Sequence, residues 1–304
     1  MGEKTEQKRK GSSLFLIDTL GMKPRLTLTV LVDNSTLTDN NFPGEAGLSF
    51  LIETAGKMCL FDTGLSGLFL ANAVKMGIGL RDLDYLILSH GHIDHTGGLP
   101  VLARHLAGAA PEGTSPRVPH LIAHPRCFWP REKEGTMNGS AVSEEEICRQ
   151  FPASLSAKPV WITDDLVFLG EIPRRFAFEQ GEPAMRKIHL PDGSIEPDTL
   201  ADDTALAFRS DEGLVIITGC SHAGICNITE YAREVCGERR VADIIGGLHL
   251  ISPTPKQLAK TGKYLNRIHL NALHACHCTS IPAKLELANY CPLQEVGLGM
   301  KFAW

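Results

Sequence analysis

Residues 83–95 read LDYLILSHGHIDH and carry the strongest structural signal in the chain. The first six are apolar except for Asp84, a pattern that predicts a short buried strand. In an irregular loop after this strand, two ligand-type side chains can point one way and two another, which favours two adjacent metal ions. The alternative, a surface loop rich in histidine by chance, is disfavoured because three histidines and an aspartate occur together. These four residues are His90, His92, Asp94 and His95.

The composition is that of an ordinary globular protein. The chain has 304 residues, of which 43% are hydrophobic and 21% charged, and its formal net charge is −5. This length can bury a substantial core without disulfides. Because the net charge is slightly negative, the chain lacks the overall excess of basic residues that is typical of nucleic-acid-binding proteins, so nucleic acid is not an expected partner.

The sequence also bears on location and on domains. Residues 1–12 carry no apolar period and are expected to form a disordered tail, without the apolar segment of a signal peptide. The longest apolar runs are too short to span a bilayer, so no membrane partner is expected. The nine cysteines are an odd number without a small-scaffold spacing, which indicates reduced thiols and a cytoplasmic protein.

Strand and helix patterns alternate along the rest of the chain, which predicts an α/β fold for a single domain over residues 13–304. Apolar runs predict strands near 26–32, 48–53, 58–61, 204–208, 214–218, 242–245, 273–275 and 298–302. Helical spacing appears near 66–76, 223–235 and 255–268. The stretch of about 108–200 is rich in Pro and Gly, and we interpret it as an insertion that forms a lid or substrate-facing region.

The two halves of the chain share a feature. Residues 85–90 (YLILSH) and 215–222 (VIITGCSH) are both apolar strands that end in a loop bearing histidine. Strand ends at one edge are where open α/β sheets place their sites, so loops of this kind are candidates for a functional site.

A second motif, Phe61-Asp62-Thr63-Gly64, precedes the H-x-H-x-D-H cluster. Together the two motifs resemble the metallo-β-lactamase superfamily. Further motifs resemble one subgroup of it, described as 7,8-dihydropterin-6-ylmethyl-4-(β-D-ribofuranosyl)aminobenzene 5′-phosphate synthases, which are transferases of methanopterin biosynthesis. These motifs, which extend the resemblance from about residue 26 to the end of the chain, are residues 47–49 (GLS), 202–203 (DD), 219–224 (GCSHAG), 246–250 (GGLHL) and 277–279 (HCT).

The resemblance implies a four-layer αββα sandwich with two divalent metal ions at one edge, with zinc expected and manganese or iron as alternatives. It assigns His90, His92 and His222 to the first metal, and Asp94, His95 and His277 to the second. It also gives Asp62 the role of orienting the ligand loop.

Four positions leave alternatives open. Asp62 either orients the ligand loop or is a turn carboxylate satisfied by nearby backbone amides. Cys220 stands where the superfamily commonly has a bridging aspartate, so it is either a thiolate ligand or a buried small side chain. Asp203 either supplies a carboxylate to the metals or caps a turn. His249 competes with His277 for the second metal, since both follow apolar strands.

The expected substrate is a small phosphorylated molecule. Basic residues concentrate in the insertion, where they either clamp an anion or are simply solvated at the surface. The candidates for substrate contact are His124, Arg174, Arg175 and Arg186. The resemblance implies a transferase that joins a pterin-methyl diphosphate to a ribofuranosylaminobenzene phosphate with loss of diphosphate. The alternative is a dinuclear-metal hydrolase of a phosphodiester, lactone or related ester.

Overall fold

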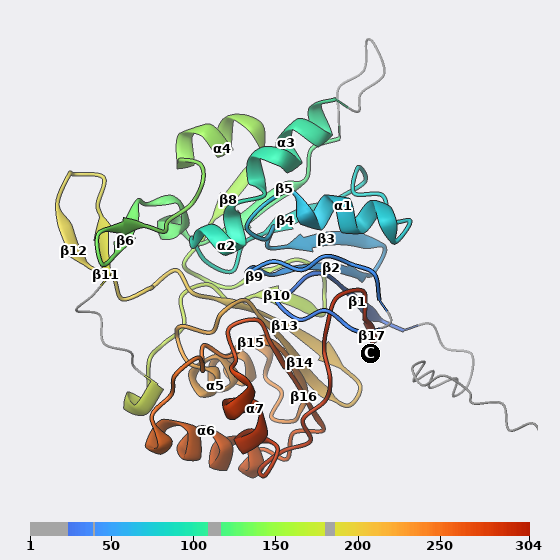
Figure 1. Cartoon of the computed structure of the whole chain (residues 1–304), viewed down its shortest axis with the longest axis vertical. Coiled ribbons are helices and arrows are strands. Elements are labelled where there is room, and N and C mark those ends of the chain that lie inside the picture. The colour runs from blue at the N-terminus through green and yellow to red at the C-terminus, as the bar shows by residue number, and fades with distance from the viewer. Residues whose placement is uncertain (1–23, 39, 109–116, 180–185) are drawn as a thin grey trace, which may run out of the picture.

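Two large β-sheets face each other in the computed structural model, and helices cover the outer face of each (Figure 1). The structure describes residues 24–38, 40–108, 117–179 and 186–304. The expected disordered tail, residues 1–12, lies outside this part of the chain.

The first sheet has seven strands, and its carboxyl-end edge carries the ligand-type loops. Strands β3, β4, β5 and β8 run parallel, so their carboxyl ends meet at one edge. Asp62 follows β3 directly, and His124 follows β5. The order is β17 (Lys301–Ala303), β1 (Leu26–Val32), β2 (Ser49–Thr54), β3 (Lys57–Phe61), β4 (Tyr85–Ile87), β5 (His120–Ala123) and β8 (Ala153–Leu155).

The second sheet has six strands and repeats this arrangement. Strands β14, β15 and β16 are parallel, and each leads into a loop with at least one candidate ligand, the loop after β14 carrying both Cys220 and His222. Cys220 lies two residues after β14, His249 two residues after β15, and His277 directly after β16. The order is β16 (Ala272–Cys276), β15 (Val241–Gly247), β14 (Gly213–Thr218), β13 (Ala205–Ser210), β10 (Leu166–Phe168) and β9 (Val160–Trp161).

Three buried hydrophobic clusters define four layers. One lies between the two sheets, with Phe50 and Phe61 facing Phe208. A second packs α1 and α3 against the outside of the first sheet, and a third packs α5, α6 and α7 against the outside of the second. The predicted αββα sandwich is therefore confirmed. The α-helices are α1 (Leu68–Lys75), α2 (Ile93–Thr96), α3 (Leu99–Ala107), α4 (Glu144–Gln150), α5 (Ile225–Cys236), α6 (Pro255–Arg267) and α7 (Ile281–Leu287).

The stretch from 108 to 200 contributes to three sheets. Strands β5 and β8 extend the first large sheet, and β9 and β10 extend the second. The other described strands of this stretch form a small antiparallel sheet beside the edge where the ligand loops meet (Figure 1). Its order is β12 (Ile195–Pro197), β11 (Arg186–His189), β6 (Arg131–Lys133) and β7 (Thr136–Met137). Among the described residues, no helix has the length and apolar character needed to cross a membrane.

Candidate metal centre

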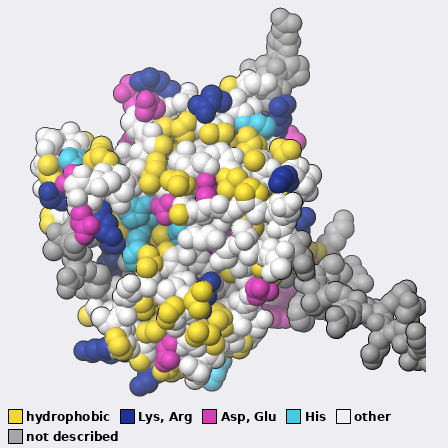
Figure 2. Space-filling model, viewed as in Figure 1, with side chains coloured by type: hydrophobic (Ala, Val, Ile, Leu, Met, Phe, Trp, Pro, Cys, Tyr) yellow, Lys and Arg dark blue, Asp and Glu magenta, His cyan; other side chains and the backbone are white. Residues whose placement is uncertain are grey.

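The loops from the two large sheets meet at a cavity of about 420 Å³. Histidine side chains show at the surface in a hollow of the molecule, with Lys and Arg side chains beside it (Figure 2). The candidate ligands that line the cavity are His92, Asp94, Cys220, His222, His249 and His277.

Three imidazoles form the first donor group. Nε2 of His90 lies 2.9 Å from Nδ1 of His92, and Nε2 of His222 lies 3.1 Å from the same atom. The pKa of His92 is lowered to about 3, mainly by burial and next by the charge of Arg131. Burial also holds the pKa values of His90 and His222 well below the ordinary value. The three rings are therefore neutral at pH 7, the protonation state that binds metal.

This group fits a divalent metal. Three nitrogens of one tetrahedral zinc site with Zn–N bonds of 2.0–2.1 Å lie roughly 3.3 Å apart, which is close to the spacing here. Ligand atoms of all three side chains lie within 4.8 Å of one another. Buried neutral imidazoles whose ring nitrogens face each other at this distance form a donor set for a borderline cation such as zinc.

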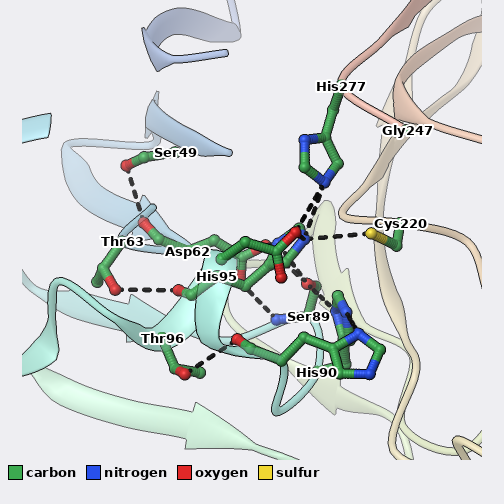
Figure 3. A network of polar contacts seen from close by, with 12 residues as sticks. Ser49, Asp62, Thr63, Ser89, His90, His95, Thr96, Cys220, Gly247 and His277 are labelled. Atoms are coloured by element: carbon green, nitrogen blue, oxygen red, sulfur yellow. Dashed lines mark hydrogen bonds and ion pairs between the residues drawn. The ribbon is translucent and has the colours of Figure 1, made fainter. Parts of the chain in front are cut away.

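The second donor group combines Asp94, His95, Cys220 and His277, whose ligand atoms also lie within 4.8 Å of one another. Nε2 of His95 lies 3.2 Å from Sγ of Cys220 and 3.2 Å from Nε2 of His277. A carboxylate oxygen of Asp94 lies 3.5 Å from Nε2 of His277. In Figure 3, Cys220 and His277 point toward His95 from the second sheet. Two nitrogens, an oxygen and a sulfur again fit zinc.

A buried carboxylate sets the orientation of His95. Oδ2 of Asp62 lies 2.7 Å from Nδ1 of His95, so the ring donates there and turns Nε2 toward the donor group. The backbone N–H and the hydroxyl of Ser89 also donate to Asp62, at 2.7 and 2.6 Å. Burial alone would lower the pKa of His95, but the charges of Asp94 and Asp62 raise it to about 9. These contacts are those of a side chain that positions a ligand.

Several residues of the centre have left-handed backbones. Their φ angles are 60° at Asp62, 61° at Ser221, 49° at His249 and 49° at His277. Such values cost energy for residues other than glycine and are typical of functional sites, where the surrounding structure enforces them. At His277 the surroundings include Asp33, which accepts its N–H at 2.8 Å, and Asn34, whose Oδ1 lies 3.0 Å from Nδ1.

A buried ion pair fixes the loop between His90 and His92. The N–H of Gly91 donates to Oδ2 of Asp202 at 2.8 Å, and the guanidinium of Arg131 donates to both oxygens of Asp202 at 3.0 and 2.9 Å. Arg131 belongs to β6 and is fully buried. A Cβ at Gly91 would lie 1.9 Å from the carbonyl oxygen of Cys127, so only glycine fits between the two histidines. The small sheet is thereby tied to the ligand loop.

A family model described as the metallo-beta-lactamase superfamily matches residues 43–233. The chain belongs to this superfamily. Its sheets, its helices and the edge at which the donor groups lie agree with that membership.

Two curated relatives come from Methanocaldococcus jannaschii. The first is named 7,8-dihydropterin-6-methyl-4-(beta-D-ribofuranosyl)-aminobenzene-5′-phosphate synthase; it is 29% identical over 280 residues, which cover 87% of this chain and 91% of the relative. The second is an uncharacterized protein that is 27% identical over 263 residues, covering 86% and 93%. A crystal structure described as a metal-dependent hydrolase of the beta-lactamase superfamily is 27% identical, with a TM-score of 0.78, and the match covers 92% of this chain and 99% of that one.

The structure also places the residues whose roles the sequence left open. Ligand atoms of His249 lie within 4.8 Å of those of Cys220 and His222, whereas His277 is the histidine grouped with Asp94. Asp203 is buried and accepts the N–H of Ala223 at 2.9 Å, a turn-capping contact. Within the described residues, it belongs to neither donor group of this superfamily site.

The four candidates for substrate contact lie in different surroundings. The guanidinium of Arg174 donates to the backbone carbonyls of His222, Thr199 and Leu200. Arg175 pairs with Glu234 of α5 and does not line the cavity. His124 is buried, with Nε2 3.6 Å from Glu171. Arg186 lines the cavity, with Nη2 3.4 Å from Nε2 of His249.

Three residues that the sequence did not single out belong to the centre. Ser89 joins Asp62 to His90, since its hydroxyl lies 2.9 Å from Nδ1 of His90. Its position directly before the histidine cluster was the available signal. In the sequence, Arg131 and Lys133 were only two members of a basic stretch. No sequence pattern there shows that Arg131 is buried or that Lys133 lines the cavity.

Proposed function

We propose that this protein is a metal-dependent transferase that joins a dihydropterin-methyl diphosphate to a ribofuranosylaminobenzene phosphate and releases diphosphate. The observation that carries the proposal is the 29% identity to the synthase from Methanocaldococcus jannaschii, which extends over 87% of this chain. The two adjacent donor groups support the proposal, because two metal ions held there would supply the positive charge that stabilises a departing diphosphate.

In the proposed reaction, the C–O bond between the pterin methylene and the diphosphate breaks, and the aryl amine nitrogen forms a new bond to that carbon and loses a proton. Two divalent ions held by the donor groups would supply Lewis acidity toward the diphosphate oxygens. The chain's own residues position the ligands: Asp62 orients His95, and Asp202 holds the backbone between His90 and His92. A cavity of about 420 Å³ is in the range of small-molecule sites.

Two finer features belong to the same proposal. The metal is zinc, because the donor sets are imidazole-rich and one includes a thiol. The protein acts in the cytoplasm, which is supported by all nine cysteines being free thiols.

A second candidate is hydrolysis of a phosphodiester, lactone or related ester. It is favoured by the 27% identity to the structure described as a metal-dependent hydrolase. The test is to incubate the zinc-loaded protein with the pterin diphosphate, with and without the aryl amine, and to measure diphosphate and coupled product. We expect product only when both are present. Turnover of a panel of phosphodiesters and lactones, without coupled product, would instead assign the hydrolase.

A further inference from the structure

A like-charge pair lies on the wall of the candidate metal centre. Lys133 of β6 and Arg186 of β11 are direct cross-strand partners, so their side chains leave the small sheet on the same face. Like charges placed opposite each other destabilise a strand pair, whereas opposite charges stabilise it. The next pair on the other face, Lys187 and Glu132, shows the compensated arrangement with an ion pair of 3.0 Å.

Neither cation of this pair forms an ion pair with a described residue. None of the ion pairs between described residues includes Lys133 or Arg186, although the sheet's other basic residues, Arg131 and Lys187, are both paired. Two cations that face each other at a cavity are the arrangement expected of an anion site.

The pair also lies between two cavities. Lys133 and Arg186 line both the metal-centre cavity and a neighbouring one of about 530 Å³. Arg186 contacts His249, and the ring of His249 lies 4.1 Å, centre to centre, from that of His222, a member of the first donor group. The guanidinium of Arg186 thus contacts an imidazole, His249, that itself packs against the first donor group. In Figure 2, Lys and Arg side chains lie beside the hollow in which histidine side chains show.

We propose that Lys133 and Arg186 form a subsite for the terminal phosphate of a diphosphate whose other phosphate lies at the metal donors. This inference rests on the proposed function, which requires a diphosphate ester as substrate, and it names the residues that bind the group. Arg186 contacts His249, which in turn packs against His222 of the first donor group, so a diphosphate, with its second phosphate, fits the donors and the cation pair better than a single phosphate does. The subsite therefore selects a diphosphate ester over a monophosphate.

The test is calorimetric titration of the zinc-loaded full chain with inorganic diphosphate, inorganic phosphate and phenyl phosphate. In the wild type we expect diphosphate to bind at least about tenfold more tightly than phosphate, since charge-assisted hydrogen bonds to two cations are added. Lys133→Gln and Arg186→Gln should each lose part of this preference, and the double variant should lose it. The difference should shrink as salt increases.

Lys187→Gln is the matched control, because it removes the same charge from the same strand on the opposite face. It should keep the wild-type affinities, and zinc content should be unchanged in all variants. Retention of the diphosphate preference by the double variant, or its equal loss in Lys187→Gln, would overturn the subsite. Equal weakening of phenyl phosphate binding in the double variant would assign the pair to a monoester and overturn the diphosphate assignment.

These titrations need no turnover, so the two proposals fail separately. If diphosphate binding depends on the pair but no coupled product forms, the subsite stands and the transferase proposal fails. If coupled product forms and the double variant keeps the wild-type KM and diphosphate affinity, the transferase proposal stands and the subsite fails.

Discussion

At the scale of single residues, three of the candidate histidine ligands have one ring nitrogen aimed at the centre and the other held by the protein. His95 donates from Nδ1 to Asp62, His277 lies against Asn34 through Nδ1, and His90 lies against Ser89. In each case Nε2 is left for the donor group. Such outer contacts fix the tautomer and the ring orientation, which is why the positioning residues matter as much as the ligands themselves.

His92→Ala tests the first donor group. Removal of one of three nitrogens should lower bound zinc from two ions per chain toward one and abolish turnover, while the metal-free fold stays intact. Elemental analysis and circular dichroism measure the two effects. His105→Ala, on helix α3 and outside both donor groups, should match the wild type. A His92→Ala protein with full zinc content and turnover would exclude His92 from the site.

Cys220 tests the second group. If its thiolate binds metal, Cys220→Ser should weaken zinc binding, and Cys220→Ala should weaken it further. The loss in Cys220→Ala should exceed the loss of about 1–2 kcal/mol in folding stability that removal of a buried side chain causes by itself. Zinc affinity can be measured by competition with a chelator. The control is Cys236→Ala, which also removes a buried thiol, but from helix α5 and away from the centre. Unchanged zinc affinity in both Cys220 variants would make Cys220 a packing residue only.

At the scale of elements, helix α5 depends on a carboxylate from outside its own sequence. Its first turn follows Gly224, which has no capping side chain, and Glu179 instead accepts the N–H groups of Cys226 and Asn227 at 2.9 and 3.0 Å. Because α5 follows directly after the loop that holds His222, this cap also stabilises one side of the candidate centre.

Glu179→Ala should therefore destabilise the fold by about 2–4 kcal/mol in chemical denaturation, since two buried donors lose their acceptor. Burial raises the pKa of Glu179 above its ordinary value, although the amides of Cys226 and Asn227 lower it in part. The folded state therefore binds the Glu179 proton more tightly than the unfolded chain does. The extra stability that comes from this tighter proton binding is present below about pH 4.5 and is lost as the pH rises through the folded pKa. Glu179→Gln should flatten that dependence. An identical pH profile in the variant would contradict this account of the cap.

The sequence predicted the two large sheets well because their strands are buried, apolar and β-branched, as in residues 26–32 and 214–218. It could not predict the small sheet, because the strands at Arg131–Lys133 and Arg186–His189 are short and charged and carry no apolar alternation. For the same reason the basic residues near 174 and 186 seemed equivalent in sequence. Only the fold separates Arg186, at the cavity, from Arg175, which pairs with Glu234 on the surface.

At the scale of the whole molecule, the donor groups join the two halves of the sandwich. His90, His92, Asp94 and His95 follow β4 of the first sheet, whereas Cys220, His222 and His277 follow strands of the second. Gly219 permits this approach, because a Cβ there would lie 2.1 Å from the Ser89 hydroxyl. Metals bound by both sets of loops would cross-link the sheets.

Removal of metal should therefore lower the stability of the whole domain. At a free zinc concentration about a thousand times the Kd, each bound ion stabilises the fold by about 4 kcal/mol, which corresponds to a fall in Tm of about 10 °C for each ion removed from a domain of this size. Differential scanning calorimetry before and after chelation, followed by zinc addition, measures the loss and its recovery. The same Tm in both states would show that the sheets pack independently of the metals.

The two donor groups together are expected to form a dinuclear metal centre. The most direct measurement is an anomalous difference map recorded at the zinc edge from crystals of the zinc-loaded protein. We expect two peaks about 3.5–4 Å apart, one bound by His90, His92 and His222 and the other by Asp94, His95, Cys220 and His277. A single peak, or peaks bound by other residues, would contradict it.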